Sequence, residues 1–207
     1  MLLDSIPDNP PSKQVQGAMA LHLKTILQDM GITVDADPNF EETPERVIKS
    51  LIEMCSGMWG TEKQIKKLMS KKFPSDYDEM VVFKNIETTS LCPHHLLPIT
   101  YQMVIGYLPS KDGYVIGLSK IPRLAELLSA RPVLQEQLAV DISKAINEHL
   151  KPNGAGVIIV GQHGCMNCRG VKMRHSKVVT AKLSGLFLEH SDIRKEFLAY
   201  YQNGQTS

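Results

Sequence analysis

Three side chains that can bind a metal ion lie within four consecutive positions of this sequence. The segment LCPHHLLP contains Cys92, His94 and His95 immediately before an alternating apolar run. Two more such residues, His163 and Cys165, occur together much later in the chain. Zinc takes thiolate and imidazole ligands, and a local Cys-x-x-His pair completed by a distant Cys is ordinary zinc geometry. The residue types and their spacing therefore predict a metal site built from two separate segments.

Such a set supplies three protein ligands, which leaves one coordination position for water. Zinc lowers the pKa of that water to about 7, so that hydroxide is available at neutral pH. The remaining histidines, namely His163 and one of His94 or His95, are suited to proton transfer, because histidine is the residue that most often serves as general acid or base. We therefore expect hydrolytic chemistry at this site.

Other interpretations of the same residues stay open on spacing alone. The cysteines could be small buried apolar residues, with the histidines in solvated turns. Cys165 and Cys168 form a Cys-x-x-Cys pair, although thioredoxin-like pairs lie at a strand-to-helix turn and a strand is expected to follow here. Cys168 could also complete a structural zinc site with four ligands, which would leave no position for water.

A second group of residues is cationic and polar. The segment GLSKIPR, with Ser119, Lys120 and Arg123, follows a predicted strand and opens a predicted helix, and the free N–H groups of a helix start favour an anion. It is not a P-loop, because the Gly-x-x-x-x-Gly-Lys spacing is absent. The other cations of the group are Arg169, Lys177, Arg46 and Lys49. Taken singly, each charge is more simply explained as a solvated surface residue.

Gln135 and Glu136 fall in the first turn of a long predicted helix. The simpler explanation of Glu136 is that its carboxylate stabilises the positive end of the helix. The functional explanation is that an amide and a carboxylate side by side bind the donor and acceptor edge of a purine. The residues alone favour the simpler explanation.

The composition is that of a globular protein whose charges nearly balance. Of 207 residues, 43% are hydrophobic, and 23 Lys+Arg oppose 22 Asp+Glu. This length allows one substantial core, and the net charge of +1 gives no reason to expect a nucleic acid or an anionic membrane as partner. The opening residues do not read as a secretory signal, and no apolar run approaches the roughly 20 residues that span a bilayer. We expect a cytoplasmic protein with reduced cysteines.

The elements that must position these residues are predicted from periodicity. Predicted helices cover residues 13–30, 43–55, 62–69, 120–130, 132–150 and 191–201. Predicted strands cover 79–91, 99–109, 114–119, 155–162 and 176–188, with a hairpin turn at 110–113 and a loop at 163–171. A loose arm and helical region over 1–77 would thus precede an antiparallel α+β core over 78–207.

Four segments together resemble the GTP cyclohydrolase I family. In chain order they are TPERVIKSLIEM, SLCPHHLLP, GLSKIPRLAELLSARPVLQEQL and HGCMNCRGV…SKVVTAKLSGLF, within about Asp37 to Phe187. The resemblance implies an α+β tunnelling fold (T-fold), with an antiparallel sheet, helices on one side and an N-terminal helical extension; residues 78–207 would be the catalytic domain. It also implies a homodecamer of two pentamers with active sites at subunit interfaces.

The implied activity is zinc-dependent opening of the guanine imidazole ring of GTP, which releases formate and gives 7,8-dihydroneopterin triphosphate. That product feeds folate, tetrahydropterin cofactors and 7-deazaguanine nucleosides. Carried over position by position, the metal ligands are Cys92, His95 and Cys165, and the proton-transfer pair is His94 and His163. Glu136 and Gln135 would hold the guanine, and Ser119 would lie at the ribose end. The residues implied for the triphosphate are Lys120, Arg123, Arg169, Arg46 and Lys49.

Two positions depart from the family pattern. Family members commonly have Glu at the position of Pro93 and an apolar residue at the position of Cys168. An alternative function, a purine- or pterin-binding module with a structural zinc and no turnover, predicts Cys168 as the fourth ligand. A thiol switch formed by Cys165 and Cys168 is a third hypothesis.

Overall fold

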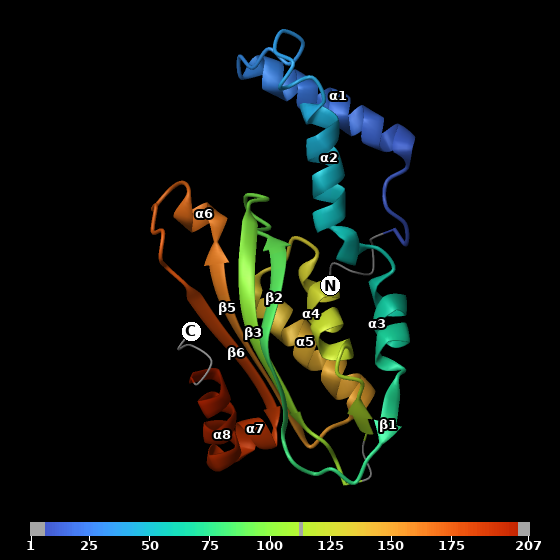
Figure 1. Cartoon of the computed structure of the whole chain (residues 1–207), viewed down its shortest axis with the longest axis vertical. Helices are drawn as coiled ribbons and strands as arrows, with labels where there is room; N and C mark the ends of the chain where they lie inside the picture. Colours follow the sequence, from blue (N-terminus) through green and yellow to red (C-terminus); the bar gives the residue numbers. More distant parts are fainter. Residues whose placement is uncertain (1–6, 112–113, 203–207) are drawn as a thin grey trace.

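The computed structural model describes residues 7–111 and 114–202, in which helices surround a central antiparallel sheet (Figure 1). The helices are α1 (Lys13–Asp29), α2 (Thr43–Met54), η1 (Ser56–Met58), α3 (Thr61–Met69), α4 (Lys120–Ser129), α5 (Gln135–Leu150), α6 (Gly164–Asn167), α7 (Leu186–Glu189) and α8 (Ser191–Gln202). The strands are β1 (Lys72–Pro74), β2 (Val81–Leu91), β3 (Pro98–Leu108), β4 (Tyr114–Ile116), β5 (Gly154–His163) and β6 (Val178–Gly185). Residues 1–6 of the predicted arm and 112–113 of the predicted turn lie outside the described residues.

The register of the central sheet brings distant segments to one end. The strand order is β2-β3-β5-β6, and each neighbouring pair is antiparallel. Leu91 at the end of β2 faces Pro98 at the start of β3, and Ile99 faces His163 at the end of β5. The loop after β2 and the segment after β5 therefore leave the sheet side by side.

Alternation along β3 determines which face of the sheet is buried. Ile99, Tyr101, Met103, Ile105 and Tyr107 are each at most 1% exposed. Because successive side chains of a strand point to opposite faces, these five share one face. They belong to the large core cluster that also contains the buried residues of α4 and α5. The helices α4 and α5 thus cover this side of the sheet.

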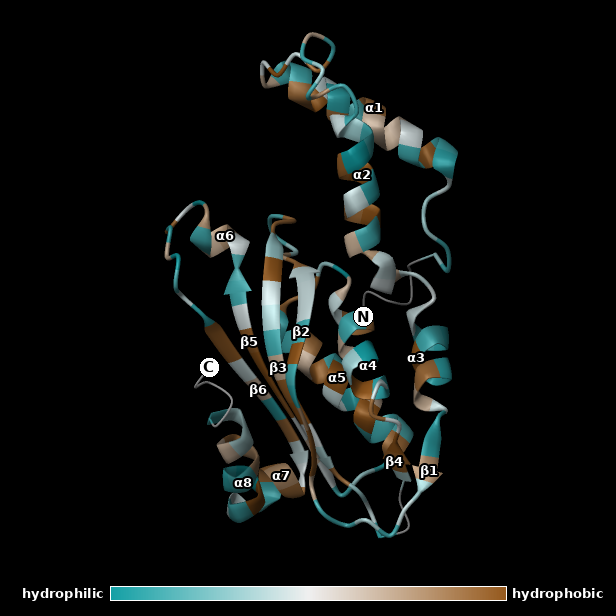
Figure 2. Cartoon of the chain, in the orientation of Figure 1, coloured by the Kyte–Doolittle hydropathy of each residue, from teal (hydrophilic) through white to brown (hydrophobic). Residues whose placement is uncertain are grey.

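The helix α4 is amphipathic in the way that such packing requires. Its buried residues Ile121, Leu124, Ala125 and Leu128 recur at the three- and four-residue spacing of one helix face. The remaining positions of the helix are mostly polar, so that teal and brown alternate along it in Figure 2. Burying the apolar face fixes the rotation of α4 about its axis.

The opposite face of the sheet is covered by α7 and α8. There Val104 and Ile158 belong to a smaller cluster with Phe187 and Phe197, whose ring centroids are 5.1 Å apart. Gly156 allows this packing, because a Cβ at that position would lie 2.5 Å from the Phe197 ring. This cluster anchors the C-terminal helices to the sheet.

The start of α5 is tied to the end of β2. Ser90 Oγ donates to the Arg131 carbonyl (2.8 Å), and the Val133 N–H donates to the Leu91 carbonyl (3.3 Å). The side chain of Arg131 is 8% exposed, and its guanidinium forms an ion pair with Asp141 on α5. The first turn of α5 is therefore held at the same end of the sheet as the loop after β2.

The helical extension at the N-terminal side consists of α1 and α2, which project beyond this end of the sheet (Figure 1). With the antiparallel sheet and its covering helices, this confirms the predicted α+β class with an N-terminal helical extension. Helices were predicted on one side of the sheet, whereas α7 and α8 cover the second face as well. The domain division at residue 77 stays a prediction; β1, before it, pairs with β4, after it. Within the described ranges, no helix has the length and apolar character needed to cross a membrane.

Some predicted elements differ from the structure. The strand predicted over 114–119 is only β4 and pairs with β1 instead of forming a hairpin with β3, because β2 and β5 occupy both edges of β3. The last predicted strand ends at Gly185, whose φ of +54° turns the chain into α7. The predicted loop at 163–171 contains α6, and the helix predicted from residue 132 begins at Gln135.

Candidate metal centre

The loop after β2 holds two metal-capable side chains in a tight turn. The Cys92 N–H donates to the Leu97 carbonyl (2.8 Å), and the Leu96 N–H donates to the Cys92 carbonyl (2.8 Å). Leu96 has a φ of +53°, a left-handed conformation that costs a residue with a side chain about 1–2 kcal/mol. The closed turn brings His95 back over Cys92.

The third side chain comes from α6, the short helix that follows β5. Its first residue, Gly164, lies so close to β3 that a Cβ there would be 2.7 Å from the Pro98 carbonyl oxygen. Since no side chain intervenes, α6 packs closely enough for Cys165 to meet the loop after β2.

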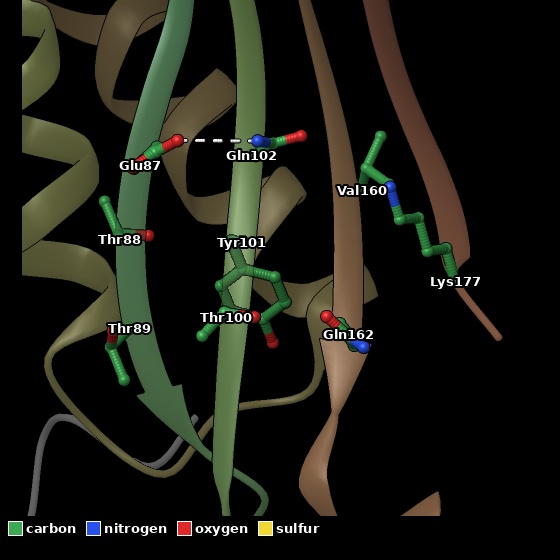
Figure 3. A pocket seen from close by; sticks show the side chains of 9 residues that line it. All are labelled: Glu87, Thr88, Thr89, Thr100, Tyr101, Gln102, Val160, Gln162 and Lys177. Atoms are coloured by element: carbon green, nitrogen blue, oxygen red, sulfur yellow. Dashed lines mark hydrogen bonds between the residues drawn. The ribbon is translucent and has the colours of Figure 1, made fainter. Parts of the chain in front are cut away.

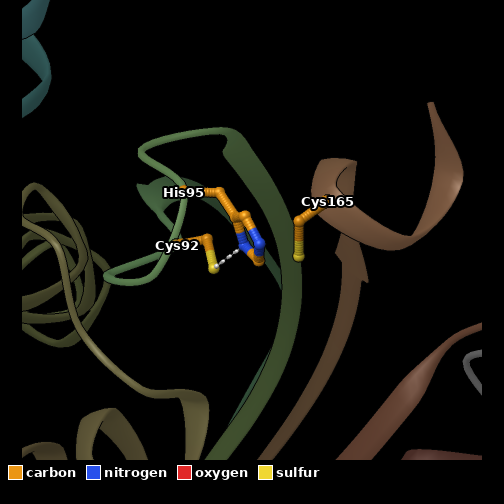
Figure 4. Close-up of side chains that lie close together, drawn as sticks. All are labelled: Cys92, His95 and Cys165. Carbon is orange, nitrogen blue, oxygen red and sulfur yellow. Dashed lines mark hydrogen bonds between the residues drawn. The ribbon is translucent and has the colours of Figure 1, made fainter. Parts of the chain in front are cut away.

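The three ligand atoms of Cys92, His95 and Cys165 all lie within 4.8 Å of one another (Figure 4). Cys92 is buried, Cys165 is half-buried and His95 is exposed. The Cys92 Sγ and the His95 Nδ1 are 3.6 Å apart. Bonds of about 2.3 Å to sulfur and about 2.0–2.1 Å to nitrogen at tetrahedral angles would separate those two atoms by about 3.6 Å. The separation of the Cys92 and His95 ligand atoms thus matches that expected around a tetrahedral metal ion.

The electrostatics of the group also favour a cation. Burial raises the pKa of the Cys165 thiol, and the neighbouring Cys92 raises it further, whereas Arg169 acts in the opposite direction. Two thiolates side by side repel each other, and a metal ion removes that cost because it binds the deprotonated forms.

His94, the first predicted proton-transfer residue, lies beside this group. Its Nδ1 is 4.0 Å from the Cys92 Sγ, and its ring meets that of His95 edge-on with centroids 6.2 Å apart. The side chain is exposed. It can therefore exchange protons with solvent or with a bound molecule.

Cys168 is oriented differently from the three ligand candidates. It is exposed, and its thiol donates to the Gly164 carbonyl (2.9 Å). In the part of the chain that the structure describes, the metal-capable group around Cys92 does not include it. This geometry favours a three-ligand site over the four-ligand alternative.

The second predicted proton-transfer residue, His163, lies at the end of β5 against two side chains. Its Nε2 is 2.9 Å from the Gln135 Oε1, and its ring packs edge-on against Tyr101 with centroids 6.3 Å apart. Burial lowers the pKa of His163, and the carboxylate of Glu136 partly opposes this effect. A neutral imidazole beside a carboxylate is suited to accept and return a proton.

The two residues predicted to hold guanine are placed differently. Gln135 is 2% exposed, and its amide is engaged by neighbouring groups of the same chain. Glu136 is exposed at the N-terminal end of α5. The carboxylate of Glu136 is therefore free to meet a ligand, whereas the amide of Gln135 is already bonded.

The predicted phosphate-binding residues do not all gather at the metal centre. Arg169 lies two residues after the end of α6, and its charge acts to lower the pKa of the Cys165 thiol. Ser119 and Lys120 begin α4, and Lys120 and Arg123 line a groove of about 970 Å³ beside β2, α3 and α4. None of the three metal-ligand candidates lines it.

Two predicted residues of α2 lie on the helical extension. Arg46 is exposed and forms an ion pair with Glu42 one turn earlier (2.5 Å), and Lys49 is exposed on the same helix. In one copy of the chain, the predicted metal ligands lie together, whereas Lys120 and Arg123 line a groove that contains none of them.

A smaller groove of about 360 Å³ lies on the sheet itself (Figure 3). Its lining includes Glu87, Gln102, Gln162 and Lys177, and the Gln102 amide donates to the Glu87 carboxylate (3.4 Å). The lining contains no cysteine or histidine. This groove therefore lacks the groups expected for the predicted chemistry.

Sequence reasoning missed the small residues that shape the site. A Cβ on Gly161 would lie 2.2 Å from the Gln135 Oε1 and 2.9 Å from the Tyr101 ring, and Gly164 is equally restricted. The sequence signal was present, because glycines flank the Gln162–His163 pair at the end of an otherwise apolar strand, and such glycines often mark a close approach.

Comparison with known proteins extends over almost the whole chain. A family model described as GTP cyclohydrolase I matches residues 19–202. GTP cyclohydrolase 1 of Campylobacter jejuni subsp. doylei is 41% identical over 180 residues, 86% of this chain and 90% of that protein. The Campylobacter concisus protein of that name is 39% identical (84% and 90% covered), and one from Dehalococcoides mccartyi strain CBDB1 is 37% identical (87% and 96% covered). The family match includes every residue of the candidate site.

Proposed function

The chain belongs to the GTP cyclohydrolase I family and is an enzyme of that family, and we propose that it uses zinc to open the guanine imidazole ring of GTP, releasing formate and giving 7,8-dihydroneopterin triphosphate. The observation that carries the proposal is the meeting of Cys92, His95 and Cys165 within 4.8 Å. Two thiolates and one imidazole suit zinc, and three protein ligands leave a position open.

The metal ion, when bound, supplies Lewis-acid activation of water at neutral pH. The surrounding residues supply the proton transfers. Protonated His163 donates a proton to the purine ring nitrogen next to C8, which makes C8 electrophilic, and the neutral imidazole that remains takes a proton back as the ring opens. His94, exposed beside the ligands, exchanges protons during the second hydrolysis that releases formate. The half-buried position of His163 keeps it neutral between these steps.

The substrate is held at its two ends. The Glu136 carboxylate accepts hydrogen bonds from the N–H groups of guanine, and Gln135 precedes it in the first turn of α5. Ser119 lies at the ribose end. The triphosphate is met by the cations Lys120, Arg123, Arg169, Arg46 and Lys49. Several cations are needed because the triphosphate carries several charges and charge-assisted hydrogen bonds to phosphate are the strong ones.

We propose that the site forms between copies of the chain. The groove that contains Lys120 and Arg123 has no metal-ligand candidate in its lining, which supports a site in which these two cations and the metal come from different subunits. We propose a homodecamer of two pentamers with the site at subunit interfaces, and residues 78–207 as the catalytic domain. We also place the enzyme in the cytoplasm, where its four free cysteines stay reduced.

The proposal is tested by incubating the purified, zinc-loaded protein with GTP. We expect stoichiometric formate and a pterin that fluoresces after oxidation, and we expect a strong chelator to abolish both and added zinc to restore them. Formation of no product by the zinc-loaded protein would contradict the proposal. X-ray absorption at the zinc edge adds a second check, since two sulfur ligands agree with the three-ligand site and three sulfurs would indicate the non-catalytic structural site with Cys168.

A further inference from the structure

Neighbouring groups hold the Gln135 amide in one orientation. The groups that face one side of the amide include backbone carbonyls, which can only accept hydrogen bonds. Its Nε2 donates to the carbonyls of Ile159 (3.0 Å) and Val178 (2.9 Å) and lies 3.2 Å from the Thr180 hydroxyl oxygen. A backbone carbonyl has no proton to give, so the NH₂ group must face this side. A rotated amide would place its oxygen against two carbonyl oxygens.

This orientation determines the state of the histidine opposite. The Gln135 Oε1 faces the His163 Nε2 at 2.9 Å, and an amide oxygen can only accept a hydrogen bond. The His163 Nε2 must therefore carry a proton. In neutral His163 the second nitrogen, Nδ1, is then the one with the free lone pair, because a neutral imidazole has one N–H.

We propose that Gln135 is a positioning residue that holds His163 in the Nε2–H tautomer and so makes Nδ1 the atom that exchanges a proton with the substrate. This assignment rests on the proposed function and gives Gln135 a role other than binding guanine. Gly161 is part of the arrangement, because any Cβ there would displace the Gln135 oxygen, which lies 2.2 Å from that position.

The arrangement matters for turnover because a proton-transfer group must present the correct nitrogen. A histidine in the other tautomer would place N–H where a lone pair is required, and rotation of the ring would have the same effect. The Gln135 amide prevents both without touching the substrate. Its loss should therefore lower kcat and leave the binding of GTP largely intact.

The first experiment compares Gln135→Met with Gln137→Met in the zinc-loaded enzyme. The two variants carry the same substitution two positions apart on α5, but Gln137 is exposed and bonds only Asp141. For Gln135→Met we expect kcat to fall by about 10- to 100-fold, part of the 10²–10⁴ that acid–base catalysis contributes, with the Kd for GTP within about threefold. Gln137→Met should stay within about twofold of the wild type in both. A raised Kd with unchanged kcat would overturn the proposal in favour of guanine binding.

Gly161→Ala is the second variant, because it leaves the Gln135 side chain and its backbone acceptors intact if Gln135→Met folds poorly. It should reproduce the selective fall in kcat, while zinc content stays at the wild-type value. Normal kcat in well-folded, zinc-loaded Gly161→Ala would contradict the arrangement.

The tautomer itself can be read without turnover. In protein labelled with ¹⁵N-histidine, solid-state NMR should show protonated Nε2 and unprotonated Nδ1 for His163, identified by the signals lost in His163→Gln. The Nδ1–H tautomer would overturn the proposal. An Nε2–H signal in a protein that makes no formate from GTP would instead leave the proposal about geometry intact and contradict the proposed reaction.

Discussion

At the scale of single residues, Cys165 and Cys168 differ although they lie one turn apart. The Cys165 Sγ lies within 4.8 Å of its two partner ligand atoms, whereas the Cys168 thiol bonds the Gly164 carbonyl. We predict that Cys165→Ala lowers zinc affinity by more than about 100-fold, because changes outside the ligand set already cost about 10- to 100-fold. Cys168→Ser, the matched control, should keep zinc and activity. Competition with a zinc-binding dye measures both, and zinc loss in Cys168→Ser would contradict the three-ligand site.

The sequence predicted the residues of this site better than their arrangement. Residue types and spacing indicated a metal group, because ligand chemistry depends on residue type, and the family resemblance then selected Cys92, His95 and Cys165 as its members. The inward-facing amide of Gln135 was not predictable, since its acceptors on β5 and β6 are set by tertiary packing. Likewise, the sequence indicated a close approach at Gly161 but not that the approaching group is the Gln135 side chain.

At the scale of elements, the site depends on how closely α6 packs against β3. Gly164→Ala would place a Cβ 2.7 Å from the Pro98 carbonyl oxygen, which is backbone and yields little, so α6 must shift and carry Cys165 with it. We predict a zinc affinity lower by about 10-fold and a stability loss of about 1–3 kcal/mol. Gly17→Ala is the control, because nothing lies within 4 Å of a Cβ there, and in mid-helix it should stabilise by about 0.5–1 kcal/mol. Equal zinc affinity in both variants, measured by dye competition, would show that α6 does not position Cys165.

The elements that were predicted well are those whose periodicity reflects burial. The alternation of β3 and the helical spacing of α4 both face the same core, so local pattern and tertiary structure agree. The prediction of a strand over 114–119 that pairs with β3 was wrong, because pairing depends on which strand edges are available. Both edges of β3 are occupied, by β2 and β5. The predicted end of β6 was wrong, because Gly185 adopts a positive φ that ends the strand. The apolar residues after Gly185 gave no sign of this turn.

At the scale of the whole molecule, the metal-capable group and the groove that contains Lys120 and Arg123 are separate features of one chain. The metal centre lies at one end of the sheet, while Lys120 and Arg123 line a groove along β2. Both β2 and β6 are edge strands of the sheet, and the unpaired backbone groups of an edge are open to pairing with another chain. A neighbouring copy that pairs along these edges would bring its own metal centre towards that groove.

This arrangement makes a prediction about mixed assemblies. Cys165→Ala and Arg123→Glu should each be inactive alone, the first without metal and the second with a negative charge facing the triphosphate. When the two are co-expressed and isolated together through two affinity tags, about a quarter of the sites should combine an intact metal centre with an intact groove, and formate release should recover accordingly. Co-expression of Cys165→Ala with His95→Ala should recover nothing, because both changes damage the ligand set of one chain. Equal failure of both pairs would show that one subunit supplies the whole site.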